Sequence, residues 1–482
     1  MLRIDFLLPD DVLLEIFDFY VNSPHYEAKT RAEAWQSLVH VCRRWRNLVF
    51  GSRRRLNMQL YCTPQTPAKD RLDIWPALPL LIMGSMVTSS GLGNVIAALG
   101  QSDRIREVTL VLTSWVLEKV VALMQVSFPE LTDLRLSSYN ETPVIPDSFL
   151  GGSAPRLQML YLNYVPFLGL PKLLLSATQL VHLHLFGIPH SGYISPKAVV
   201  ATLSALSSLN TLCLQFRSPQ SRPDLESPGL LPPKRSVLPA LNAFRFKGVT
   251  EYLEELVTRI DTPQLDQLDI TFFNQIDFHC PRLAQFIYCT QALTALNEGH
   301  VHFDNRMASI RLRSPTSKIS SGNFQIDISC REPDWQLSSI EQVCGSSFPP
   351  LPTVEDLYIE HQYSQQVWKD DAIENTLWMQ LLLPFTTVKN LYLSKEFVPG
   401  IAAALQDLVG GGITEVLPSL QNILVEGLEP SGPGQGCIGR FVAARQLRVS
   451  NHPIAISVWD KDFDESGDTD SDDLNDPNLE SR

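Results

Sequence analysis

The sequence lacks the cysteine pattern of a zinc-binding or secreted scaffold, and it is modest in charge. Its eight cysteines, spread over 482 residues, contain no Cys-x-x-Cys pair, which disfavours a zinc finger or a dense disulfide framework. Charged residues make up 19 % of the chain and hydrophobic residues 44 %. That balance is typical of folded protein with core for two to four domains. We therefore expect reduced thiols and a cytoplasmic or nuclear protein.

Long hydrophobic runs are also missing. The most apolar stretch, residues 75–87, is interrupted by Pro76, Pro79 and Gly84, and it falls short of the roughly twenty residues that span a membrane. The opening residues Met-Leu-Arg-Ile-Asp have neither the basic flank nor the apolar core of a secretion signal. We expect no membrane partner.

The acidic charge is concentrated at one end. Of the net charge of −13, residues 460–482 carry −8, because ten carboxylates there are offset only by Lys461 and Arg482. The other 459 residues carry −5, and so weak a field does not gather phosphate backbones. We expect no nucleic-acid partner, and we interpret residues 459–482 as a disordered acidic tail.

A short pattern recurs along the chain: an apolar residue, two variable residues, an apolar residue, one variable residue and a last apolar residue. The copies begin at Ile105, Leu131, Leu157, Leu180, Leu209, Leu241, Leu265, Val354, Val388 and Leu420. The alternation at the end of each copy predicts a short strand with one face inward. A single unit cannot bury that face, whereas stacked units bury it between neighbours, at about 1.5–3 kcal/mol per leucine.

Helical patterns separate several of these strands. They cover residues 116–124, 195–203, 252–260 and 399–409, and Ser195 followed by Pro196 is typical of a helix start. Between residues 293 and 354 the pattern blurs, since residues 310–314 and 324–329 alternate like hairpin strands and residues 335–343 favour a helix. Residues 217–234, rich in Pro and Ser, indicate an exposed loop. The repeats resemble irregular leucine-rich repeats.

The first fifty residues differ in kind. Residues 8–17 open a helix, with Pro9 in its first turn and Asp10 and Asp11 at its positive end. A second helical run has an apolar side and an opposite side with three arginines. The apolar residues of the two runs are Val12, Leu13, Ile16, Phe17 and Tyr20, then Trp35, Leu38, Val39, Cys42, Trp45 and Val49.

These residues resemble an F-box over about the first 55 positions. The matching segments are Leu8-Pro9, Asp10-Asp11, Leu13-Leu14, Ile16-Phe17 and Val41-Cys42-Arg43-Arg44-Trp45. The connection over residues 22–33 is longer than the family's usual one. The remainder is similar to the fungal F-box proteins that carry degenerate leucine-rich repeats. The fold class expected is α/β, with all-α F-box helices followed by a solenoid of parallel inner strands and outer helices.

The resemblance implies a non-catalytic substrate receptor. An F-box docks on a Skp-family adaptor, which joins a cullin scaffold and a RING ubiquitin ligase, while the repeats hold a protein target. By the family's pattern, the adaptor-binding residues are Leu8, Pro9, Leu13, Ile16, Phe17, Val41 and Trp45. The domains expected are an F-box over 1–55, a linker or cap over 56–100, a solenoid over 101–458 and the tail over 459–482.

The variable strand positions are the candidate target-binding residues, because a solenoid presents them together on its concave face. They are Arg135, Tyr161, His182, His184, Phe186, Arg245, Lys247, Tyr358 and Tyr392. Aromatic residues and arginine often anchor interfaces. Arg245 and Lys247 are suited to a phosphorylated or acidic segment.

Two motifs suggest chemistry only weakly, and we expect no enzyme, cofactor or metal. Residues 434–439 spell Gly-x-Gly-x-x-Gly, but they lack the βαβ context of a dinucleotide site and favour a flexible loop. The strand pairs His182/His184 and His300/His302 have no carboxylate or thiol placed by sequence to complete a metal site, so exposed histidines are expected. The alternative function is a ligase-independent leucine-rich-repeat scaffold that binds proteins.

Overall fold

The chain divides into two compact units, residues 1–268 and 269–482, which we describe separately. The computed structural model describes residues 8–21, 28–52, 60–62, 68–74, 79–85, 89–138, 144–220, 235–275, 278–294, 296–314, 322–345, 348, 351–361, 375–408, 416–427, 433–448 and 453–459. None of the helices in these ranges is long and apolar enough to cross a bilayer.

Three helices form the N-terminal module of the first unit: α1 (Asp10–Val21), α2 (Ala28–Val41) and α3 (Arg43–Gly51). Their core consists of Leu13, Leu14, Phe17, Val21, Trp35, Leu38, Val39 and Val49. The Cys42 sulfur caps α3 by accepting a hydrogen bond from the backbone N–H of Trp45 at 3.4 Å. Arg44 ties α3 to the start of α1 by donating to the Leu8 carbonyl at 2.8 Å. The first predicted helical run is confirmed. The second, expected as one run from Trp35 to Val49, is divided into α2 and α3, because the backbone of Cys42 is extended and begins a new helix.

Parallel strands follow the module in chain order. They are β1 (Leu60–Cys62), β2 (Leu80–Ser85), β3 (Ile105–Leu112), β4 (Asp133–Ser138), β5 (Met159–Asn163), β6 (His182–Ile188), β7 (Thr211–Phe216) and β9 (Ala243–Gly248). A separate parallel pair joins β8 (Ser236–Val237) and β10 (Ile260–Asp261). The strand β11 (Gln267–Phe273) contains the boundary between the units.

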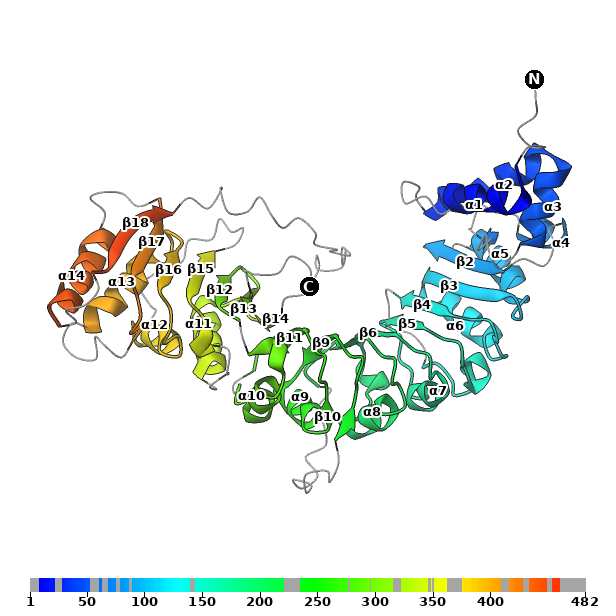
Figure 1. Ribbon diagram of the computed structural model, residues 1–482. Helices are drawn as coiled ribbons and strands as arrows, with labels where there is room; N and C mark the ends of the chain where they lie inside the picture. The colour runs from blue at the N-terminus through cyan, green and yellow to red at the C-terminus, as the bar shows by residue number, and fades with distance from the viewer. Residues whose placement is uncertain are drawn as a thin grey trace. The chain divides into compact units, whose positions relative to one another are not determined.

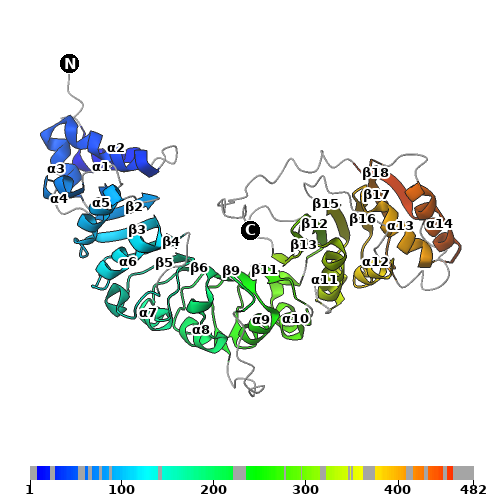
Figure 2. The same ribbon diagram turned by 180° about the vertical axis from the view of Figure 1, so that it is seen from behind.

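Helices cover the outer side of these strands (Figures 1 and 2). They are α4 (Ala68–Ile74), α5 (Ser89–Leu99), α6 (Ser114–Leu123), α7 (Leu170–Ser176), α8 (Pro196–Leu203) and α9 (Thr250–Val257). Ser195 caps α8 by accepting a hydrogen bond from the Ala198 N–H at 3.3 Å. The helix predicted to reach Ile260 ends at Val257, because Ile260 pairs in β10 instead.

Register aligns the apolar positions of successive repeats. Leu134 pairs with Leu160, Leu160 with Leu183, and Leu183 with Leu212. Leu136, Leu162, Leu185 and Leu214 form the next buried row in the same way. The residues that lead these copies, from Leu131 to Leu241, are also buried. The repeat strands predicted in this unit are therefore confirmed, and their core lies between the sheet and the helices.

The second unit interrupts the parallel pattern with an antiparallel insertion. β12 (Glu298–Phe303) pairs antiparallel with β13 (Met307–Arg313), and β13 pairs antiparallel with β14 (Asn323–Ser329). Parallel pairing then resumes from β12 to β15 (Asp356–His361). It continues through β16 (Asn390–Leu393), β17 (Asn422–Glu426) and β18 (Ala455–Trp459). The hairpin-type strands predicted between residues 293 and 354 are confirmed.

The α-helices that accompany these strands in the described ranges are α10 (Pro281–Tyr288), α11 (Pro333–Gly345), α12 (Asn375–Leu382), α13 (Val398–Asp407) and α14 (Pro433–Arg448). The prediction of a flexible loop at residues 434–439 is wrong, since these residues lie inside α14. Glycines within a helix cannot form the strand–turn–helix cradle of a dinucleotide site.

Two predicted boundaries differ from the structure, and two predicted segments lie outside the described residues. Residues 60–99, expected to be a linker or cap, contain β1, α4, β2 and α5, and β2 pairs with β3. Trp459, expected to open the acidic tail, is the last residue of β18. Residues 460–482 and most of the predicted 217–234 loop lie outside the described residues.

The aligned leucine rows make a stability prediction. Leu160→Ala should lower the free energy of unfolding by about 2–5 kcal/mol, because it leaves a cavity in a fully buried row. Denaturant unfolding of the full chain measures the change. Leu175→Ala, at an exposed position of α7, should stay within about 0.5 kcal/mol of wild type. Equal losses in the two variants would contradict the role of the row.

Candidate functional site

The first candidate surface lies on the N-terminal module. Helix α1 is apolar on two sides, and only one side faces the module's core. Ile16 is 48 % exposed and Phe19 79 %, and Val12 and Tyr20 are exposed as well. Ile16 follows Val12 by four residues, and Phe19 and Tyr20 follow Ile16 by three and four. Residues at these spacings lie on one side of a helix, so the four side chains form one stripe.

The structure divides the predicted adaptor-binding set. Leu13 and Phe17 are buried, and Trp45 packs on Phe17 with ring centroids 4.6 Å apart. These three side chains hold the module together, so in this conformation Leu13 and Phe17 offer a partner no surface. Ile16 and Val41 are exposed, Pro9 is exposed and Leu8 is half-buried.

Sequence reasoning missed Phe19 on this surface. Phe19 follows Ile16 by three residues, so helical spacing alone could have placed it on the same stripe. It was missed because the family's pattern, rather than the spacing, selected the residues.

The second candidate surface is a row of side chains across the first unit's strands. Arg135 on β4 pairs with Tyr161 on β5, and Tyr161 pairs with His184 on β6. Beyond His184 the row continues through Cys213 to Arg245 on β9. Arg135 and Arg245 are exposed, whereas Tyr161 and His184 are half-buried. Arginines therefore flank an aromatic centre.

Ring contacts fill that centre. His184 stacks on Phe186 with centroids 5.8 Å apart and an interplanar angle of 17°, and Tyr161 lies 5.1 Å from Phe186. His182 lies 6.2 Å from His184. Lys247 occupies the neighbouring row, paired with Gln215. All seven residues predicted for this unit thus belong to one sheet, on β4, β5, β6 and β9, with β7 between the last two.

His184 is a neutral imidazole at neutral pH. Burial is the main cause that lowers its pKa to about 4, and the charges of His182, Arg245 and Arg135 act in the same direction. The centre of the row therefore adds hydrogen-bonding capacity without charge, and positive charge comes from the flanking arginines.

The third candidate surface is an aromatic stack in the second unit. His300 on β12 stacks on Tyr358 of β15 with centroids 4.4 Å apart and planes 6° apart. Tyr358 stacks on Tyr392 of β16 at 4.1 Å and 9°. Trp459 packs its ring against Tyr392 at 5.5 Å and 70°. Parallel register brings these rings together, because His300, Tyr358 and Tyr392 occupy one row.

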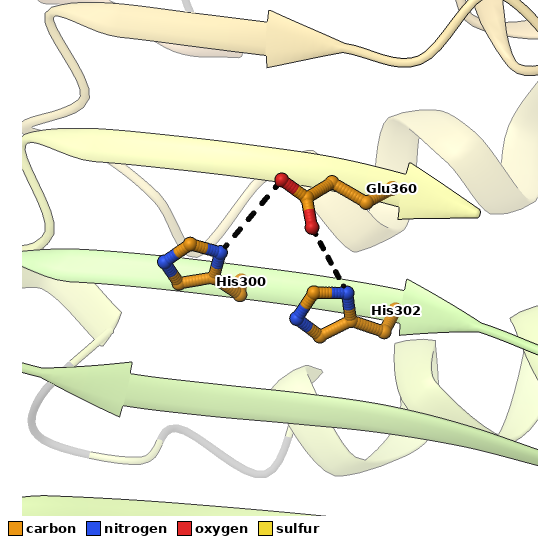
Figure 3. A group of neighbouring side chains, drawn as sticks. All are labelled: His300, His302 and Glu360. Atoms are coloured by element: carbon orange, nitrogen blue, oxygen red, sulfur yellow. Dashed lines mark ion pairs between the residues drawn. The ribbon is translucent and has the colours of Figure 1, made fainter. Parts of the chain in front are cut away.

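His300 and His302 lie beside the Glu360 carboxylate next to this stack (Figure 3). The His302 Nδ1 lies 3.1 Å from the Glu360 Oε2, and the His300 Nδ1 lies 4.0 Å from the Glu360 Oε1. The His300 Nε2 lies 2.6 Å from the Glu298 Oε1. Glu298 also accepts a hydrogen bond from Arg313 Nε at 2.7 Å.

The predicted exposure of the strand histidines is wrong here. His300 is 7 % exposed, and register places the Glu360 carboxylate beside the histidine pair. The hydrogen bond from His300, together with Arg313, lowers the pKa of Glu298 to about 2. Burial lowers the pKa of His300. The pair is therefore a neutral histidine against an ionised carboxylate at neutral pH.

A nearby carboxyl group behaves in the opposite way. Burial raises the pKa of Asp327 on β14 to about 6, even though the Gln325 amide donates to both of its oxygens at 2.9 and 3.0 Å. A carboxyl whose pKa is higher in the folded chain than in the unfolded chain binds protons preferentially in the folded chain. Its contribution to stability therefore falls as the pH rises from about 4 to 6.

That sign gives a pH-dependent prediction. Asp327→Asn should raise the melting temperature at about pH 7.5, where the buried carboxylate costs stability, and the stability gain should fall to about a third of that value at about pH 4.5. Thermal unfolding of both proteins across that range measures the difference. Asp304→Asn, at a site that accepts backbone hydrogen bonds, is the control and should show no such gain at high pH. A gain from Asp327→Asn that is equally large at both pH values would contradict the assignment.

Comparisons with known proteins give little. No family model and no curated protein matches the chain. Among solved structures, the chain is similar to the leucine-rich-repeat-containing protein LegL7 from Legionella pneumophila, at 13 % identity and a TM-score of 0.27. That match covers 80 % of this chain and 97 % of the other.

Proposed function

We propose that this chain is a non-catalytic substrate-recognition subunit of a cullin–RING ubiquitin ligase. In this proposal the N-terminal module docks a Skp-family adaptor, and the strand faces of the repeats bind a protein target. The ligase's other subunits perform the chemistry, and the chain contributes by holding the target close to them.

The observation that carries the proposal is the exposed stripe of α1. The core of the module is complete without it, since Leu13, Leu14 and Phe17 already fill the interior. Exposure of the apolar side chains of Phe19 and Ile16 to water is unfavourable in the free chain. Clusters of exposed apolar residues mark interaction sites. The resemblance of residues 8–45 to an F-box supports a Skp-family adaptor as the partner.

The proposed target-binding role is supported by the row of side chains that runs from Arg135 to Arg245 across the strands of the first unit. Its arginines and aromatic rings are the residue types that anchor interfaces, and register aligns them across five strands. Two flanking arginines around neutral His184 favour an acidic or phosphorylated segment.

The first experiment tests docking. Ile16→Asp should reduce recovery of a recombinant Skp-family adaptor at least tenfold, because it places a charge in an apolar contact and such anchors contribute about 2 kcal/mol or more. Pull-down with purified proteins measures recovery. Leu175→Asp is the matched control, since it makes the same change at a similarly exposed position of α7. It should leave recovery unchanged.

Two outcomes would contradict adaptor docking. One is failure of the folded wild-type chain to recover the adaptor. The other is equal recovery by Ile16→Asp and wild type. Either result favours the ligase-independent scaffold. Thermal unfolding of the variants establishes that Ile16→Asp is folded, and exposure of Ile16 predicts a melting temperature close to wild type.

The second experiment tests target binding. The double variant Arg135→Ala/Arg245→Ala should lose a subset of the proteins captured by proximity labelling in cells and retain the adaptor. The control, Lys172→Ala/Lys197→Ala, removes the same charge from exposed positions on α7 and α8. It should retain both the adaptor and the captured proteins. An unchanged set of proteins in the arginine variant would exclude this row as the target site.

A further inference from the structure

Figure 3 shows three potential metal ligands converging in the second unit. His300 and His302 alternate along β12, so both imidazoles lie on one face of the sheet. Parallel register pairs His302 with Glu360 and His300 with Tyr358. Glu360 therefore lies directly opposite one histidine and diagonal to the other, and its carboxylate lies beside both rings.

The hydrogen bonds determine which nitrogen of His300 is available. Its Nε2 lies 2.6 Å from the Glu298 Oε1, a distance that requires a proton between them. A neutral imidazole with the proton on Nε2 has a bare lone pair on Nδ1. That Nδ1 faces the Glu360 Oε1 at 4.0 Å. A carboxylate that orients a histidine through its second nitrogen is the usual outer partner of a histidine that binds zinc.

His302 contributes a buried nitrogen that forms no hydrogen bond. Its Nδ1 is buried and forms no hydrogen bond, although the Glu360 Oε2 lies 3.1 Å away. A buried polar atom without a hydrogen bond destabilises the folded chain unless another group satisfies it. Two imidazole nitrogens thus face one carboxylate, an arrangement that a cation would satisfy.

The distances are close to those of a zinc site. Nitrogen and oxygen ligands about 2.0–2.2 Å from a tetrahedral zinc ion lie about 3.3–3.5 Å from one another. The His300 Nδ1 lies 4.0 Å from one oxygen of Glu360 and the His302 Nδ1 lies 3.1 Å from the other. With one ligand atom from each residue, the three atoms lie within 4.8 Å of one another. Small rotations of the two imidazole rings, which move their nitrogens by about 1 Å in total, would bring the ligand atoms to tetrahedral zinc distances.

We propose that His300, His302 and Glu360 bind a divalent transition-metal ion of the zinc type, with water in the fourth position. The ion would clamp β12 to β15 where parallel pairing resumes after the antiparallel insertion. Arg313 is the nearby cation that opposes binding, since its Nη2 lies 3.0 Å from the His300 Nε2. Glu298 offsets that charge by accepting from Arg313 Nε at 2.7 Å. This site does not depend on adaptor docking.

Titration of the full-length, tag-free chain with Zn²⁺ alone tests the proposal, after chelator treatment and dialysis. Calorimetry should give one ion per chain with a dissociation constant in the micromolar range or below. Saturation with Zn²⁺ should raise the melting temperature by about 5 °C. Glu360→Gln keeps the shape of the side chain and removes the charge, and it should weaken binding at least tenfold, as should His302→Ala.

Matched controls separate this site from other ligands. His182→Ala alters a strand histidine with the same two-residue spacing, and the described residues offer no carboxylate that completes a set there. This variant should bind Zn²⁺ like wild type. Glu298→Gln removes the outer carboxylate and should weaken binding by a smaller factor than Glu360→Gln.

A cobalt spectrum distinguishes metal bound at the histidine–carboxylate site from metal bound by a cysteine thiolate. Cys289 is an exposed free thiol that could capture zinc. Co²⁺ bound to histidine and carboxylate should give visible d–d bands without a thiolate charge-transfer band, and Glu360→Gln should lose those bands. Three results would overturn the proposal: no saturable uptake by folded wild-type chain, unchanged affinity in Glu360→Gln and His302→Ala, or a thiolate band in the cobalt spectrum.

Discussion

The burial of two apolar rows between a parallel sheet and its helices is the constraint on which the rest of each unit depends. In the first unit, Leu134, Leu160 and Leu183 fall opposite one another, and Leu136, Leu162 and Leu185 do the same two positions later. Side chains alternate faces along a strand, so a slip of one residue would turn every leucine into solvent. The hydrophobic pattern therefore fixes the register at each strand pair.

The same register decides which polar and aromatic side chains meet on the other face. Once Leu134 opposes Leu160, Arg135 must oppose Tyr161, and Tyr161 must oppose His184. In the second unit, pairing of Val301 with Ile359 brings His302 to Glu360. The composition of these polar and aromatic rows is thus positioned by core packing.

Local patterns could be read from the sequence, and pairings across long separations could not. Each repeat strand is marked by its own leucines, and the alternation of residues 310–314 and 324–329 indicated the insertion. Glu360 is 58 residues from His302, and only the pairing of β12 with β15 across the insertion shows that they meet. In α1, both sides of the helix carry apolar residues, so the sequence pattern does not show that Phe17 is buried and Phe19 is exposed.

Polar groups are buried on the face that β12 shares with β15. His300 and Glu360 are both less than a tenth exposed, so water alone does not satisfy the His300 ring nitrogens. Glu298 satisfies one nitrogen by accepting a hydrogen bond from the His300 Nε2, and Tyr358 covers the ring. The His302 Nδ1 remains unsatisfied. A buried nitrogen without a hydrogen bond lowers the stability of the folded chain, and the proposed metal ion would remove that cost by accepting the nitrogen as a ligand.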